Sequence, residues 1–346
     1  MIRFLKRLVL FLILLCVVAA GAAVWVRARL LAPYRGFGDA EIFVDLPAGS
    51  GVQGIARRLA DAGVVVDPYT FRLAARLSGS ERHLQAGEYR FADPATPYEI
   101  VARLARGDVA KQVLTIPEGL TIREMSAIFA NSGLGTADDF IAAAADGSLI
   151  ADLDPDARTL EGYLFPDTYS LSRRATADVA VRTMLASFER AFDTRLRADA
   201  TAAGLSPREA VTLASLVEKE TASADERPIV AAVYRNRLRA KMALQCDPTV
   251  IYALMQAGRW HGNITKPDLQ IDSPYNTYRY AGLPPGPIAS PGRASLDAAV
   301  HPADVPYLYF VSRNDGTHAF ATTLAEHSRN VAKWQVQYFR EKKNRP

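Results

Sequence analysis

Two glutamates in one predicted helix are the first residues that could do chemistry. Residues 207–222 carry alanine, leucine and valine at helical spacing, with Glu218 and Glu220 near the end. At about 100° per residue the two carboxyl groups lie roughly 160° apart around the helix axis, so they cannot both serve one small site. The pattern alone favours two solvated glutamates on an amphipathic helix. Small residues surround Glu218, however, and leave room for another molecule to approach its carboxyl group.

Three further blocks, residues 161–169, 244–252 and 272–278, combine aromatic rings with polar groups outside any clean helical pattern. Tyrosine rings stack on sugar faces, and amide groups bond to hydroxyls in pairs. The blocks therefore suit carbohydrate binding, with turn chemistry and helix capping as the alternative interpretation. Together with Glu220, the residues that we expect to bind the substrate are Tyr163, Asp167, Gln245, Asp247, Thr249, Asn276, Thr277 and Tyr278.

Several other chemistries lack the residue pattern that they need. The five histidines show no metal-ligand spacing, and His-Glu-x-x-His is absent. Ser215 lies inside the predicted helix without the context of a nucleophile elbow. No Gly-rich phosphate loop follows a predicted strand. We therefore expect neither a metal ion nor another cofactor.

Five blocks of the sequence are recognisable when they are taken together in order. They read Glu-Gly-Tyr-Leu-Phe-Pro-Asp-Thr-Tyr at 161–169, Ala-Ser-Leu-Val-Glu-Lys-Glu-Thr at 214–221, Asp-Pro-Thr-Val-Ile-Tyr at 247–252, Asp-Ser-Pro-Tyr-Asn-Thr-Tyr at 272–278 with Gly-Leu-Pro-Pro-Gly-Pro-Ile at 282–288, and Tyr-Leu-Tyr-Phe-Val at 307–311 with Asp-Gly-x-His-x-Phe at 315–320. In this order and spacing they closely resemble the YceG-like endolytic murein transglycosylases. The resemblance covers nearly the whole chain.

This resemblance implies an activity and a domain organisation. The family cleaves the β-1,4 bond between N-acetylmuramic acid and N-acetylglucosamine inside peptidoglycan strands, leaves a 1,6-anhydro-muramyl end and consumes no water. Such cleavage would limit the elongation of nascent strands, and it implies a partnership with the synthases called penicillin-binding proteins. The implied catalytic residue is Glu218. Residues 41–110 resemble the family's LysM-like module, and residues 111–346 its catalytic domain.

The spacing of the carboxyl groups agrees with a lytic mechanism. A two-carboxylate glycosidase needs a second carboxyl group about 5 Å or about 6.5–9.5 Å from the first, and Glu220 is badly placed for that role. One carboxyl group can instead act first as acid and then as base. A hydrolytic muramidase stays open as an alternative, with its second carboxylate at Asp167, Asp247 or Asp272. A non-catalytic wall-binding scaffold is the other alternative.

The elements that must position these residues indicate a mixed α/β fold. Capping-box spacing appears at Ser50, Thr96, Thr121 and Ser206, each with Glu or Gln three residues later. Residues 261–292 are rich in Pro, Gly, Asn and Tyr and show no periodicity, which is typical of a functional loop. We expect strands at 41–46, 64–66, 84–91, 112–116, 163–170, 306–312 and 318–322. We expect helices at 52–62, 68–78, 97–106, 122–131, 137–145, 177–197, 207–222, 226–241, 248–257 and from about 323.

The N-terminus predicts a membrane anchor. Residues 8–26 carry no charge, and a helix of that length spans roughly 28 Å, close to a bilayer core. Arg3, Lys6 and Arg7 precede the span and favour a cytoplasmic N-terminus in the bacterial inner membrane, with residues 1–7 in the cytoplasm. Residues 27–40 would form a linker to a periplasmic body. A cleaved signal peptide is the alternative, because Ala20-Gly21-Ala22 resembles a cleavage site.

The charge of the chain belongs to this N-terminus. The formal net charge is +4 and the sequence pI is about 9.0. Residues 1–40 hold six basic groups and one acid, and the remainder holds 35 basic and 36 acidic groups. A nearly neutral body has little long-range attraction for a polyanion, so we expect no nucleic-acid partner.

Overall fold

The computed structural model describes residues 2–338 and residue 340, and it divides the chain into two compact units. The first unit comprises Met1–Gln112 and Ser170–Arg174, and the second comprises Val113–Tyr169 and Ala175–Pro346. The described residues form helices together with short strands that pair two by two. The predicted mixed α/β class is therefore confirmed.

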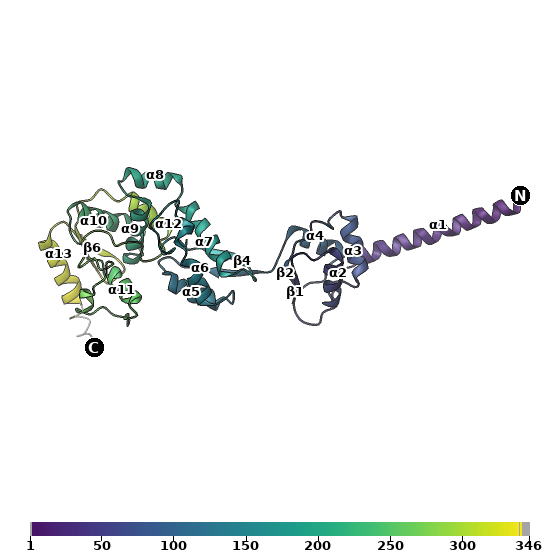
Figure 1. Ribbon diagram of the computed structural model, residues 1–346, viewed down its shortest axis with the longest axis horizontal. Helices are drawn as coiled ribbons and strands as arrows, with labels where there is room; N and C mark the ends of the chain where they lie inside the picture. Colours follow the sequence, from purple (N-terminus) through teal and green to yellow (C-terminus); the bar gives the residue numbers. More distant parts are fainter. Residues whose placement is uncertain (1, 339, 341–346) are drawn as a thin grey trace. The chain divides into compact units, whose positions relative to one another are not determined.

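The chain begins with the long helix α1, Ile2–Leu31, drawn in purple in Figure 1. Its segment Lys6–Leu31 has a mean hydropathy of 2.9 and buries none of its most apolar stretch inside the protein. By length and composition α1 could cross a membrane, and a signal sequence would have the same character. Near its C-terminal end, Leu30 enters the core of the first unit.

The first unit folds around its own apolar core. Strand β1 (Ile42–Leu46) pairs antiparallel with β2 (Gly87–Phe91), and Val44 lies opposite Tyr89. Three helices cover this pair: α2 (Val52–Asp61), α3 (Pro68–Leu77) and α4 (Pro97–Arg106). The buried side chains that join them include Leu46, Leu59, Phe71, Tyr89 and Leu104. Burial of several large side chains is the main stabilising contribution.

Two predictions in the first unit are wrong. Residues 64–66 form bends, because Val64 and Val65 bury their side chains behind α2 without a partner strand. Both of their N–H groups donate to the carbonyl of Leu59, in the last turn of that helix. The capping box at Ser50 is absent, since Gly51 is the N-cap of α2 and makes no side-chain bond. By contrast, the box of Thr96 with Glu99 forms as predicted.

The second unit is a helical body with a small hairpin. Its helices and strands are β3 (Lys111–Thr115), α5 (Ile122–Asn131), α6 (Ala137–Ala144), β4 (Thr168–Ser172), α7 (Ala177–Ala191), α8 (Thr194–Ala202), α9 (Pro207–Glu220), α10 (Arg227–Arg239), α11 (Asp247–Gln256), α12 (Arg293–Val300), β5 (Tyr309–Ser312), β6 (His318–Ala321) and α13 (Leu324–Val331). Short 3-10 helices at Gly147–Ile150 and Asp268–Gln270 and a π-helical turn at Ala332–Gln337 complete it. Strands β3 and β4 are each divided between the two units.

Helix α9 lies at the centre of this unit, in contact with α8, α10, α11 and α12 (Figure 1). Eight consecutive residues of α9, from Ala210 to Val217, are buried. A helix that is buried all round is a core helix rather than an amphipathic surface helix. The interpretation of Glu218 and Glu220 as solvated surface glutamates is therefore wrong.

The second unit differs from the sequence-based expectations at three elements. The helix expected at 177–197 is broken, because Asp193 accepts the N–H of Leu196 and so starts α8 as an N-cap. Helix α12 was not expected: it has only eight residues, and its N-cap Gly292 provides no side-chain bond. The strand expected at 163–170 begins only at Thr168, after a turn at 161–164.

Candidate active site around Glu218

The sequence fixes the start of α9 through local bonds. Ser206 and Glu209 exchange the two hydrogen bonds of a capping box, and Pro207 occupies the first turn. The helix then runs through the core and ends at Glu220. Glu218 is therefore carried on a rigid element, directly after the fully buried Val217.

The carboxyl group of Glu218 is enclosed and has two defined partners. Its side chain is only 7% exposed. One oxygen, Oε2, accepts the backbone N–H of Gly292 at 3.0 Å. The other oxygen, Oε1, lies 3.5 Å from Nη2 of Arg227, a guanidinium that is itself 11% exposed. A cation and a backbone donor thus hold the carboxyl group in one orientation.

A second carboxyl group shares this arginine. Oε2 of Glu118 lies 3.7 Å from Nη2 of Arg227, the same nitrogen that faces Glu218. Partial burial, together with the negative charge of Glu218, raises the pKa of Glu118, and Arg227 opposes that rise. Glu118 is half-exposed, so its carboxyl group is accessible from solvent. The site therefore contains two carboxyl groups around one cation.

Two glycines leave space beside these carboxyl groups. Gly119 has φ of +76°, which favours glycine, and its Cα faces the Cγ atom of Glu218. A side chain at Gly292 would overlap the carboxyl group of Glu118. The strand-to-helix turn that holds Gly119 is fixed by Nζ of Lys219, which donates to the carbonyl of Gly119 at 2.9 Å. Only residues without a Cβ fit at these two positions without displacing Glu118 or straining the turn.

Arg227 is positioned by the start of α10. Its Nε donates to Oγ of Ser295 on α12 at 3.1 Å. The preceding residue, Glu226, accepts the backbone N–H of His318 at 2.8 Å and lies 2.7 Å from Nδ1 of the same histidine. These bonds tie α10 to α12 and β6, which leaves the guanidinium little freedom to leave Glu218.

Glu220 lies in different surroundings, as its angular separation from Glu218 predicts. Its Oε2 accepts the hydroxyl of Tyr234 at 3.1 Å and lies 3.7 Å from Sγ of Cys246. Complete burial raises the pKa of Glu220 and holds the pKa of the Cys246 thiol well above its ordinary value. Its partners are thus internal groups of the protein, on α10 and before α11.

Six of the residues expected to bind substrate come together in space. Thr249 and Thr277 share a hydrogen bond at 2.9 Å, and the N–H of Gln245 donates to the carbonyl of Thr277. The hydroxyl of Tyr278 donates to Asp247 at 2.6 Å. Asn276 is buried and bonds to two carbonyl groups of its own loop. Asp247 and Tyr278 border an open pocket of about 580 Å³.

Tyr163 and Asp167 do not join this group. Tyr163 is buried, and its hydroxyl donates to the buried carboxyl group of Asp154. Asp167 is exposed, accepts the N–H of Thr168 at 2.7 Å and uses its carbonyl to bind Ile116. Neither these residues nor Asp272 share a bonding partner with Glu218 among the described residues.

Sequence reasoning missed Glu118 and Arg227. Glu118 lies in a Pro-Glu-Gly turn that directly precedes the capping box at Thr121, and Arg227 lies at the predicted start of a helix. A turn accounts for Glu118 and a helix start accounts for Arg227, so neither local pattern indicates a contact with Glu218. Among residues 2–338, no cluster of three or more His, Cys, Asp or Glu residues could hold a metal ion.

Comparison with known proteins agrees with this arrangement. The model of the YceG-like family matches residues 44–333. A Bacillus subtilis protein named endolytic murein transglycosylase is 32% identical over 330 residues, which cover 91% of this chain and 90% of that protein. A protein of the same name from Streptococcus pneumoniae is 30% identical over 356 residues and covers 93% of this chain, which spans 64% of that longer protein.

A solved structure extends the comparison to the fold. The crystal structure of a YceG-like protein from Listeria monocytogenes is 31% identical and covers 84% of this chain and 99% of its own, with a TM-score of 0.57. The resemblance noted in the sequence blocks is thereby confirmed over most of the chain. By sequence and by fold, this chain belongs to the YceG-like family.

Proposed function

We propose that this protein is an endolytic murein transglycosylase. It would cleave the bond between N-acetylmuramic acid and N-acetylglucosamine within peptidoglycan strands and leave a 1,6-anhydro end. The observation that carries the proposal is the enclosed carboxyl group of Glu218, held by Arg227 and the N–H of Gly292. Its position in the sequence matches the catalytic glutamate that the family resemblance implies. The names of the relatives support the same activity.

The mechanism uses the carboxyl group of Glu218 twice. Its proton passes to the glycosidic oxygen as the C1–O4 bond breaks, and the N-acetylglucosamine end leaves as an alcohol. The carboxylate then takes the proton of the C6 hydroxyl while O6 bonds to C1. Atoms balance without water, and the glutamate ends protonated as it began. Arg227 and Gly292 keep the same carboxyl oxygens in place through both steps.

Contacts to the strand would come from the group of residues that meet at α11. Asp247 and Tyr278 border an open pocket, and Gln245 is exposed beside them. Thr249, Asn276 and Thr277 are buried and would act by shaping this surface. Glu220, Tyr163 and Asp167 would support this surface indirectly rather than contact the strand, because their bonding partners lie within the protein.

We further propose that α1 anchors the protein in the bacterial inner membrane. The apolar stretch lacks burial within the protein, and Arg3, Lys6 and Arg7 precede it, which favours a cytoplasmic N-terminus. The parts of the two units that follow α1 would then lie in the periplasm, close to nascent strands. Residues 41–110 of the first unit would be the LysM-like module of the family. Penicillin-binding proteins would be the partners that supply the strands.

Mass analysis of digested glycan strands tests the activity. Purified strands are incubated with the full chain in detergent, and products are weighed. Products that lack one water relative to hydrolysis products, and that disappear with Glu218→Gln, are expected. Products of full hydrolytic mass contradict the lytic mechanism. A wild-type chain that leaves the strands uncut, with glycan products and phenotype both unchanged by Glu218→Gln, would support a wall-binding scaffold.

The hydrolytic alternative has one observation in its favour. Glu118 shares Nη2 of Arg227 with Glu218, so a second carboxyl group stands near the first. A muramidase could use Glu118 as nucleophile or base. In that case Glu118→Gln would abolish cleavage and the wild-type products would contain the added water. Under our proposal the products of the Glu118→Gln variant keep their anhydro ends.

A further inference from the structure

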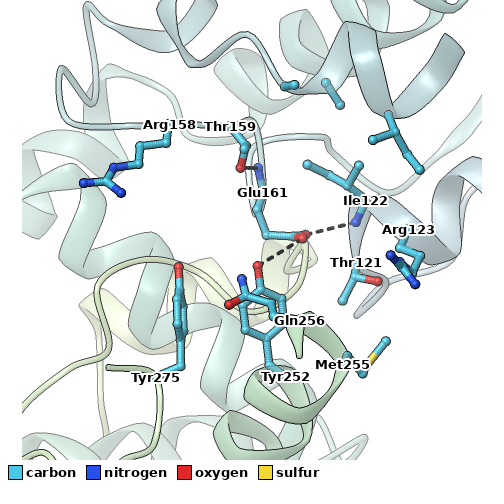
Figure 2. Close-up of a pocket in the computed structure, with 13 residues that line it drawn as sticks. Thr121, Ile122, Arg123, Arg158, Thr159, Glu161, Tyr252, Met255, Gln256 and Tyr275 are labelled. Atoms are coloured by element: carbon cyan, nitrogen blue, oxygen red, sulfur yellow. Dashed lines mark hydrogen bonds between the residues drawn. The ribbon is translucent and has the colours of Figure 1, made fainter. Parts of the chain in front are cut away.

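A second pocket of the same unit surrounds another glutamate, Glu161. Its volume is about 470 Å³, within the range of small-ligand sites. Figure 2 shows Glu161 at its centre, with Tyr252 and Tyr275 below it and Arg158 and Arg123 on opposite sides. The two tyrosine rings have centroids 4.8 Å apart. None of the residues that hold Glu218 lines this pocket.

Glu161 contributes no full negative charge to the pocket at neutral pH. Its Oε1 accepts the N–H of Ile122 at 3.1 Å, and its Oε2 accepts the hydroxyl of Tyr252 at 3.4 Å. Burial outweighs both bonds and raises the pKa of Glu161 to about 8, with a further rise from the charge of Glu124. No cation lies within ion-pair distance of its carboxyl group among the described residues.

The arginines of this pocket are the charges that remain. Arg123 and Arg158 are both exposed, and neither guanidinium group forms an ion pair or a hydrogen bond with another described residue. Two positive charges therefore face one pocket in a body whose charges otherwise nearly cancel. An arginine fork matches the geometry of a carboxylate. Apolar side chains such as Ile141 and Met255 line the same space and suit methyl groups.

The pocket is connected to the active site by a short piece of chain. Glu118 shares Arg227 with Glu218, Gly119 lies beside the Glu218 side chain, and Ile122 and Arg123 line the pocket. Three residues of extended chain, from Gly119 to Ile122, reach at most about 10 Å. This is the scale of one disaccharide. A ligand attached to the strand at or next to the cleaved sugar could therefore reach the pocket.

We propose that the pocket of Arg123, Arg158 and Glu161 binds the peptide stem of the murein strand through a stem carboxylate. This inference rests on the proposed function, because it takes murein as the substrate. The N-acetylated sugars of a strand carry no charge, whereas its stems carry free carboxylates and alanine methyl groups. Unpaired arginines beside apolar walls fit the stem better than the sugar.

Equilibrium binding tests this proposal without turnover. The full chain with Glu218→Gln is titrated with labelled murein strands whose stems carry free carboxylates, and with the same strands after those carboxylates have been converted to neutral amides. We expect the strands with free stem carboxylates to bind about tenfold more tightly, the effect of one charge-assisted hydrogen bond. Adding Arg123→Gln and Arg158→Gln should bring the two dissociation constants together.

The control replaces two exposed arginines elsewhere in the unit. Arg195→Gln with Arg329→Gln makes the same change in charge, and it should keep the preference for strands with free stem carboxylates. Equal affinities of the two probes for the Glu218→Gln chain would overturn the proposal. So would a loss of affinity for both probes alike in the Arg123 and Arg158 variant, which would assign the pocket to the sugars. Failure of the proposed function appears separately, in the product masses of the wild-type chain.

Discussion

Glu218 and Glu161 lie in the same unit, in contrasting surroundings. Each carboxyl group is withdrawn from solvent and accepts one backbone N–H, from Gly292 and from Ile122 respectively. Glu218 also has a guanidinium at 3.5 Å, whereas Glu161 has only a phenol at 3.4 Å. Burial without a cation raises the pKa of Glu161 to about 8. The two carboxyl groups thus differ in their partners: a guanidinium lies beside Glu218, and no cation lies within ion-pair distance of Glu161 among the described residues.

The largest expected effect is on the Glu218 side of this comparison. Glu218→Gln removes the only group that exchanges protons with the strand, so we expect cleavage to fall by roughly 10²–10⁴-fold. Product analysis by mass spectrometry measures this. Glu189→Gln, an exposed glutamate on α7, is the matched control and should keep full activity. A Glu218→Gln variant with wild-type turnover would remove Glu218 from the mechanism.

Removing the guanidinium of Arg227 should destabilise the protein, because Glu218 would then be buried without a cation, as Glu161 is. Arg227→Gln leaves Glu218 and Glu118 without their shared partner, and loss of one member of a buried ion pair costs about 3–5 kcal/mol of unfolding free energy. Denaturant unfolding measures the loss. Glu118→Gln in the same background should recover part of it, because one uncompensated carboxyl group is removed. If Arg227→Gln and the double variant are equally unstable, the uncompensated carboxyl group of Glu118 does not destabilise the site.

The Glu161 side of the comparison predicts a pH dependence of stability. Between its ordinary value of 4.5 and about 8, the folded protein holds a proton that the unfolded chain has lost. Stability should therefore fall as pH rises through this window, and Glu161→Gln should abolish that part of the fall, on the order of 5 kcal/mol. Unfolding at pH 5, 7 and 9 measures it. Glu189→Gln should keep the wild-type slope; an unchanged slope in Glu161→Gln would contradict the assigned cause.

Alanine substitutions at two glycines can distinguish the effect of backbone strain from the effect of lost space beside Glu218. Gly119 and Gly133 both have positive φ, +76° and +78°. Alanine at either position should cost about 1–2 kcal/mol of stability. Only Gly119 faces Glu218, since nothing lies near Gly133. We therefore expect Gly119→Ala alone to lower kcat/KM, severalfold, in a cleavage assay. Equal kinetics in the two variants would show that the space beside Glu218 is not used.

The smallest expected effect is that of salt. The body outside residues 1–40 is close to neutral, so long-range attraction contributes little. Between about 50 and 200 mM salt we expect cleavage to change by less than roughly tenfold, against about 10³–10⁵ for binding that releases many counterions. Initial rates at increasing salt measure this. A steep decrease in the cleavage rate would mean that long-range attraction dominates recognition of the strand, and that Arg123 and Arg158 are not its main charged contacts.

The sequence predicted those parts of the molecule that depend on neighbours within about four residues. Thr96, Thr121, Ser206 and Thr323 each start a helix with a glutamate three residues on, as observed. A capping box consists of bonds between a side chain and a nearby backbone, so it can be read directly. The same kind of local signal was misleading at 64–66, where Val64 and Val65 are buried in the core but pair with no strand.

What the sequence alone determined is therefore the helix carrying Glu218, the apolar N-terminal helix and, through its blocks, the family. Only the tertiary structure decided that Glu218 is enclosed, that Glu118 and Gly292 come to it from 100 and 74 residues away, and that Glu161 lacks a cation. The physical reason is that these contacts depend on how α9, α10 and α12 pack together. No spacing along the chain specifies which side chains meet across a core.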